Sequence, residues 1–194
     1  MNAPLPPSEP SRLEALREYR LLDTKPETAF DDITTLAAHI CDVPIALMVL
    51  LDESRQWFKS RVGLAAAETP REHAFCAHTV LMDQTMVVED AQADDRFSAN
   101  PLVTAEPHIR FYAGAPLINA DGHALRTLCV IDREPRTLAP DKTLALESLA
   151  RQVVAQMELR RVARSLAEAM GGIHTLQGLL PVCAWCKSVR DDKG

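Results

Sequence analysis

Residues 111–118 read FYAGAPLI, and residues 127–132 read TLCVID. Both runs are short, apolar and partly β-branched, which is typical of buried strands. The segment between them contains Asp121-Gly122, a pair that favours a tight reversal of the chain. The sequence therefore predicts two neighbouring antiparallel strands, and the segments on either side are expected to pack around them.

Length and composition indicate an ordinary globular protein. The chain has 194 residues, of which 47% are hydrophobic and 25% are charged, enough for one domain with extensions. No apolar run approaches the ~20 residues of a membrane-spanning helix, and the N-terminus lacks the pattern of a secretory signal. We therefore expect a cytoplasmic protein with no membrane partner. The net charge of -6 argues against nucleic acid as a partner, because nucleic-acid-binding proteins usually carry a basic face.

The first half of the chain predicts helices followed by strands. We expect a Pro-rich, disordered tail over residues 1–10 and then a short helix that opens at a Ser11–Glu14 capping box. Apolar residues recur on one face over residues 27–40, which predicts an amphipathic helix. The continuous apolar run at 45–51 predicts a central strand that is buried on both faces.

The predicted strand at residues 55–61 carries Trp57, Lys59 and Arg61 on one face. That face forms either a basic and aromatic rim or an exposed sheet edge whose charges prevent pairing with another chain. The further predicted elements before the hairpin are a helix over residues 72–82, a strand over 86–88 and a loop over 91–108. A connection as long as this loop is usually functional.

The chain is expected to be helical from Asp141 onwards. Apolar residues then recur at alternating steps of three and four, a pattern typical of a parallel coiled coil. These residues are Leu159, Val162, Leu166, Ala169, Ile173, Leu176 and Leu180. The alternative is a helix that packs back on its own domain, but we favour a homodimer through a coiled-coil helix over residues 159–180.

The tail over residues 181–194 contains Cys183 and Cys186, the only cysteine pair with metal-type spacing. One such pair supplies half of a tetrahedral zinc site, and two tails in a parallel dimer would supply all four thiolates. The pair is alternatively a redox dithiol. Our first interpretation is a truncated piece of a longer module.

Several short motifs resemble those of one family. They are FDDI at 30–33, RQWFKS at 55–60, ETPR at 68–71, FCAH at 75–78, DDRF at 94–97, RFYAGAPL at 110–117 and TLCVID at 127–132. From Leu13 to Arg160 the chain resembles the GAF domains of bacterial sensor kinases and diguanylate cyclases. The resemblance implies an α+β, profilin-like fold over residues 11–158, with a six-stranded antiparallel sheet, flanking helices and a ligand cavity under a helix and a loop.

One residue departs from the family pattern. Arg126 stands where the family usually has a glycine. A long cation there is expected to lie on the exposed side of its strand or to reach toward the helices.

The resemblance also suggests candidate ligand-binding residues around the cavity. These are Phe75, Cys76, His78, Asp94, Phe97, Arg110, Tyr112 and Cys129. His78 is the first candidate for a polar contact with a ligand, although a His bonded to a loop carbonyl is the more common structural role. An Asp–Arg pair among Asp94, Asp95, Arg96 and Arg110 either holds the loop closed over the cavity or belongs to ordinary surface ion pairs, each of which contributes under about 1 kcal/mol.

The functional hypothesis is a non-catalytic sensor. An unidentified small-molecule ligand would change the packing of the C-terminal helix in a homodimer, and an output domain of kinase or diguanylate cyclase type would respond. The sequence identifies no cofactor. One alternative is an enzyme like the free methionine-R-sulfoxide reductases, with Cys76 and Cys129 as reactive thiols. Another is a dimerisation module without a ligand.

Overall fold

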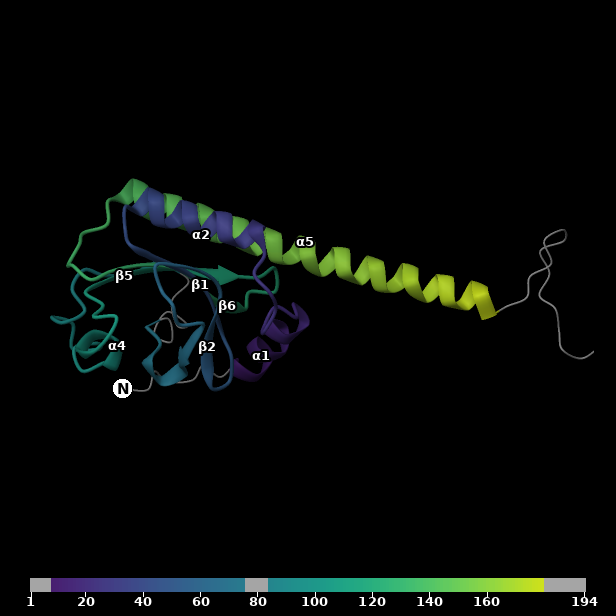
Figure 1. Ribbon diagram of the computed structural model, residues 1–194, viewed down its shortest axis with the longest axis horizontal. Coiled ribbons are helices and arrows are strands. Elements are labelled where there is room, and N and C mark those ends of the chain that lie inside the picture. Colours follow the sequence, from purple (N-terminus) through teal and green to yellow (C-terminus); the bar gives the residue numbers. More distant parts are fainter. Residues whose placement is uncertain (1–7, 76–83, 180–194) are drawn as a thin grey trace, which may run out of the picture. The chain divides into compact units, whose positions relative to one another are not determined.

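The computed structural model describes residues 8–75 and 84–179, with side chains as far as Gly171. The chain divides into two units, Met1–Met157 and Glu158–Gly194. The long helix α5 (Pro140–Leu179) runs from the first unit into the second (Figure 1).

The first unit is built on a six-stranded sheet in the order β3-β2-β1-β6-β5-β4. Its strands are β1 (Ile45–Leu51), β2 (Arg55–Val62), β3 (Glu68–Pro70), β4 (Met86–Val88), β5 (Phe111–Ile118) and β6 (Ala124–Asp132). Every neighbouring pair is antiparallel. The predicted GAF-like fold class and the predicted β5–β6 hairpin are therefore confirmed.

The turn of this hairpin is fixed by one side chain. The Asn119 Oδ1 atom accepts hydrogen bonds from the backbone N–H groups of Asp121 at 3.2 Å and His123 at 2.8 Å. Gly122 has a φ of +82°, a backbone conformation that glycine adopts without steric penalty. The Asp121-Gly122 pair thus forms the turn that it predicted, and the positive φ at Gly122 explains why a glycine stands there.

Two faces of the sheet carry two separate cores. On one face, which we call the helix face, α1 (Glu9–Glu18), α2 (Thr28–Cys41) and the first part of α5 pack against alternate residues of the strands. Figure 1 shows α2 and α5 running along the sheet. On the opposite face, the front face, the core is closed by the turn η1 (Arg71–His73), the short helix α4 (Pro101–Thr104) and the loops around them. Alternation along β1 explains the division, since Met48 lies in the helix-face core and Leu47 in the front-face core.

Three sequence-based expectations need correction or completion. The first helix begins at Glu9 rather than at Ser11. Glu9 is held by arginines far away in the sequence, which no local capping pattern reveals. The disordered tail that was expected over residues 1–10 therefore does not extend to Glu9. Trp57 and Lys59 form no exposed edge, since both are buried and β3 pairs outside β2. The helix expected over residues 72–82 is represented by the turn η1, and its remainder lies largely outside the described residues.

The side chain of Arg126 reaches toward the helices, which was the second of the two positions expected for it. Its side chain is 1% exposed and lies on the helix face, where its Nη2 atom is 4.0 Å from the Glu9 carboxylate of α1.

Candidate functional site

Three of the candidate ligand residues form an aromatic cluster in the front-face core. The Phe75 ring stacks on the Phe97 ring with centroids 4.2 Å apart and planes 9° apart, and it lies 5.1 Å from the Tyr112 ring. A Cβ atom at Gly114 would collide with the Tyr112 hydroxyl oxygen, so the glycine of the FYAGAPLI run makes room for this ring. Cys129 belongs to the same core.

Arg110 and Asp94 do not bind each other. The Arg110 Nε and Nη2 atoms each donate to Asp90 at 2.8 Å, and this hydrogen bonding lowers the pKa of the Asp90 carboxyl. Asp94 instead accepts from Arg96 in the adjacent turn. The Asp–Arg pair that ties the ends of the long loop together is therefore Asp90–Arg110. Its acid lies two residues after the end of β4, and the sequence analysis assigns Asp90 no role.

Cys76 and His78 lie outside the described residues, as do Cys183 and Cys186. Among the residues that the structure describes, no cluster of three or more His, Cys, Asp or Glu side chains is arranged to hold a metal ion. No helix in this part of the chain is long and apolar enough to cross a membrane.

The front face also contains a cavity of about 420 Å³, lined by residues from β1, β2, β3, β6 and α4 and from the loops around them. Its floor consists of the buried side chains of Ile45, Leu47 and Phe58, while Leu64 and Leu102 form part of its walls. The lining also includes two exposed charged residues, Glu106 and Arg133. The cavity is thus mainly apolar and carries charge where it is open to solvent.

None of the described candidate residues Phe75, Phe97, Tyr112 and Cys129 lines this cavity, although all four pack in the same front-face core. Alternation along residues 45–51 places Ile45 and Leu47 on one face of the sheet. Part of the wall comes from α4 and the long loop, which was expected to be functional, whereas no role was expected for residues 63–66.

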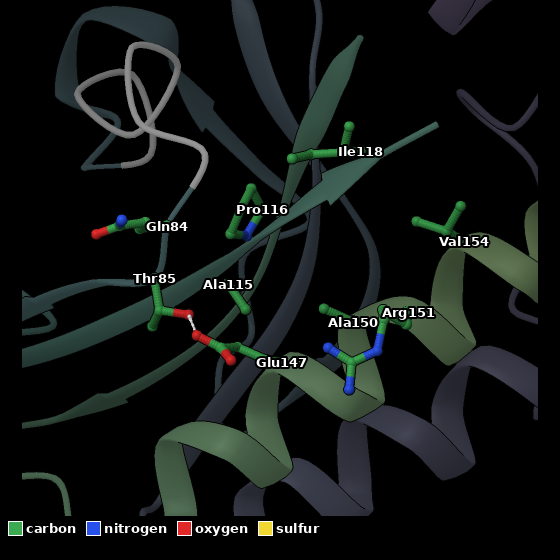
Figure 2. Close-up of a pocket in the computed structure, with 9 residues that line it drawn as sticks. All are labelled: Gln84, Thr85, Ala115, Pro116, Ile118, Glu147, Ala150, Arg151 and Val154. Carbon is green, nitrogen blue, oxygen red and sulfur yellow. Dashed lines mark hydrogen bonds between the residues drawn. The ribbon is translucent and has the colours of Figure 1, made fainter. Parts of the chain in front are cut away.

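A second cavity, of about 440 Å³, lies between β5 and α5 within the first unit (Figure 2). Ala115, Pro116 and Ile118 of β5 line one side of it, and residues of α5 line the other. The Thr85 hydroxyl, just before β4, donates to Glu147 of α5 at 2.8 Å (Figure 2). This bond connects the edge of the sheet to α5 through the Oε1 atom of Glu147.

Comparison with known proteins identifies the fold family. A family model described as "GAF domain" matches residues 25–157. This chain belongs to the GAF family. A relative that is 42% identical over 175 residues is a cyclic di-GMP phosphodiesterase of Pseudomonas aeruginosa, a bacterial signalling protein. The match covers 90% of this chain but only 30% of that relative.

Solved structures show the same GAF fold at low sequence identity. A domain of a two-component sensor histidine kinase from Sinorhizobium meliloti matches with a TM-score of 0.60 and 16% identity, covering 73% of this chain and 97% of that one. The free methionine-R-sulfoxide reductase of Neisseria meningitidis matches with a TM-score of 0.57 and 17% identity, covering 84% and 98%. At these low sequence identities the two structures support the fold alone, and the reductase alternative stays a prediction. Cys129, one of the two thiols that this alternative requires, is only 2% exposed.

Proposed function

We propose that this GAF domain is a non-catalytic sensory module of a bacterial signalling protein, in which a small molecule in the front cavity changes the state of α5. The observation that carries this proposal is the apolar cavity of about 420 Å³ on the front face. Ligand sites in proteins are usually concave, mainly apolar and between about 300 and 1,000 Å³ in volume. The charged groups of Glu106 and Arg133 are positioned to orient a ligand at the opening.

A path of contacts connects the front face with α5. Met86 and Val88 of β4 belong to the front-face core, and Thr85, directly before them, is hydrogen-bonded to Glu147 of α5. A ligand that changes the packing of the front-face core would therefore displace β4 and with it the partner of Glu147. The ligand can shift the equilibrium between two arrangements of α5 only by the difference in its affinity for them.

The second unit supplies the surface for a homodimer. Leu159, Val162 and Leu166 of α5 are each about 60% exposed, at 62%, 59% and 60%. Large apolar side chains repeated at steps of three and four on an exposed helix are typical of a coiled-coil seam. We propose that two copies pair through this seam and that the pair carries the ligand signal to an output domain. The sequence resemblance favours a kinase or a diguanylate cyclase, and the Pseudomonas relative adds a phosphodiesterase to these candidates.

Native mass spectrometry tests ligand binding with a matched pair of variants. Ala66 lines the front cavity, whereas its neighbour Ala67 does not, although both are exposed. The wild-type protein and Ala67→Trp should retain a small molecule acquired in the cell, and Ala66→Trp, whose indole enters the cavity, should lose it. Retention of the same molecule by Ala66→Trp, or no retained molecule in any of the three, would count against the cavity as the binding site.

A further inference from the structure

A buried ionic cluster lies where α1 and η1 meet at the end of β1, and none of its residues lines the front cavity. We call Glu9, Arg12, Arg71 and Arg126 the Glu9 cluster. The Glu9 carboxylate accepts from Arg12 Nε at 2.8 Å and Nη2 at 2.6 Å, and it lies 2.7 Å from Arg71 Nη1 and 4.0 Å from Arg126 Nη2. Three guanidinium groups from α1, η1 and β6 thus surround one carboxylate.

The cluster carries more positive than negative charge at a site with little access to water. The side chains of Glu9, Arg12 and Arg126 are 9%, 2% and 1% exposed, and that of Arg71 is 15% exposed. Burial by itself would raise the pKa of Glu9, but the hydrogen bonds from Arg12 and Arg71 outweigh it and lower the pKa to about 2. The surroundings of this carboxylate therefore favour a negative charge strongly.

Two of the guanidinium groups are held in place independently of Glu9. Arg12 Nη2 donates to the Leu51 carbonyl at 2.9 Å, and Arg71 Nη1 donates to the Asp52 carbonyl at 2.8 Å, both at the end of β1. The buried Nη1 atom of Arg12 has no hydrogen-bond partner among the described residues. This leaves a buried donor that an anion with more oxygen atoms than a carboxylate would satisfy.

We infer that the Glu9 cluster is a binding site for a doubly charged oxyanion, either inorganic phosphate or the terminal group of a phosphate monoester, and that Glu9 occupies this site as an internal substitute. Guanidinium groups match the geometry and charge of phosphate oxygens. A dianion would balance the three positive charges better than one carboxylate does. Its binding would release Glu9 and with it the first turn of α1. Arg126, which replaces the glycine usual in the family, supplies one of the three charges.

Rescue of a charge-neutral variant by phosphate tests this inference in the full chain. In chloride, Glu9→Gln should lower the melting temperature by roughly 10 °C, because Arg12 and Arg71 lose the carboxylate that they bind. Inorganic phosphate at the same ionic strength should restore most of this loss while changing wild-type protein much less. Glycerol phosphate provides the second arm: rescue by both compounds indicates a site open to monoesters, and rescue by phosphate alone indicates a site for the free ion.

Two controls separate the site from a general salt effect. Glu53 forms an exposed pair with Arg17 at 3.6 Å, so Glu53→Gln should melt like the wild type and show no response to phosphate beyond that of chloride. The double variant Glu9→Gln/Arg12→Gln should lose the rescue. If Glu9→Gln responds equally to phosphate, glycerol phosphate and chloride, the cluster is structural only and the inference is wrong.

Wild-type protein gives an independent measurement should Glu9→Gln not fold in any of these buffers. Phosphate that displaces Glu9 should speed amide hydrogen exchange in α1 relative to chloride at equal ionic strength. Equal exchange in the two salts would overturn the inference.

Discussion

Replacement of Lys59 by methionine should destabilise the domain more than most single substitutions on a strand. The Lys59 ammonium group is fully buried and donates to Thr24 Oγ1 at 2.8 Å, the Lys25 carbonyl at 2.7 Å and Glu27 Oε1 at 2.7 Å. It also lies 5.5 Å from the centre of the Phe30 ring of α2. These contacts fasten the segment between α1 and α2 to the middle of β2.

The magnitude follows from the contacts that Lys59→Met removes. Each of three hydrogen bonds contributes about 1 kcal/mol, and the cation–π contact adds about 0.5–1 kcal/mol. Methionine preserves the alkyl packing and removes the desolvation penalty of the charge, which offsets about 1 kcal/mol. We therefore expect a net loss of about 2–3 kcal/mol, or a fall in melting temperature of roughly 5–10 °C.

Urea denaturation followed by circular dichroism measures this loss. Arg61→Met on the same strand is the matched control, since Arg61 is exposed and its replacement should change the free energy of unfolding by less than about 0.5 kcal/mol. Equal stabilities of Lys59→Met and Arg61→Met would refute the reasoning, because they would mean that the buried ammonium group adds nothing beyond its alkyl chain.

Three further outcomes are expected. Phe97→Ala should lower the free energy of unfolding by about 3–5 kcal/mol, since it removes a ring that is 1% exposed and stacked on Phe75; calorimetry should show a loss far below this range if the ring packs loosely. The pKa of Glu9 falls from 4.5 to about 2 on folding, so its charge stabilises the folded state above pH ~4.5 and this contribution disappears as the pH falls toward ~2. The difference in unfolding free energy between wild type and Glu9→Gln should therefore shrink across that window in urea titrations, and a constant difference would contradict the assignment. Leu166→Asp should yield a folded monomer in sedimentation velocity, whereas Ala163→Asp, off the proposed seam, should sediment like the wild type; identical sedimentation of both variants would exclude the seam as the interface.

Local patterns predicted the centre of the sheet well. The turn at Asp121-Gly122, the apolar run of β1 and the apolar run of β5 each depend on neighbours in the sequence, and the structure contains all three features. Phe75, Phe97 and Tyr112 were chosen as ligand-binding candidates from the family motifs, and the structure places their rings in contact with one another in the front-face core.

Features that depend on long-range contacts were missed. The start of α1 depends on a salt bridge between Glu9 and Arg71, which are far apart in the sequence. The burial of Lys59 depends on acceptors in the segment before α2, so its charge alone suggested an exposed surface. Residues 63–66, which form part of the cavity wall, belong to a loop for which no role was expected. Their role results from where the sheet places them.

Hydrogen exchange of α5 measures whether an occupied front cavity changes the state of this helix. Ala66→Trp fills the cavity with the protein's own side chain, so no ligand needs to be known, and Ala67→Trp is its control. We expect Ala66→Trp to change amide exchange over residues 144–171, and we expect Thr85→Val, which removes the hydrogen bond to Glu147, to abolish the change. Identical exchange of α5 in Ala66→Trp and Ala67→Trp, with a crystal structure showing the indole inside the cavity, would contradict this expectation.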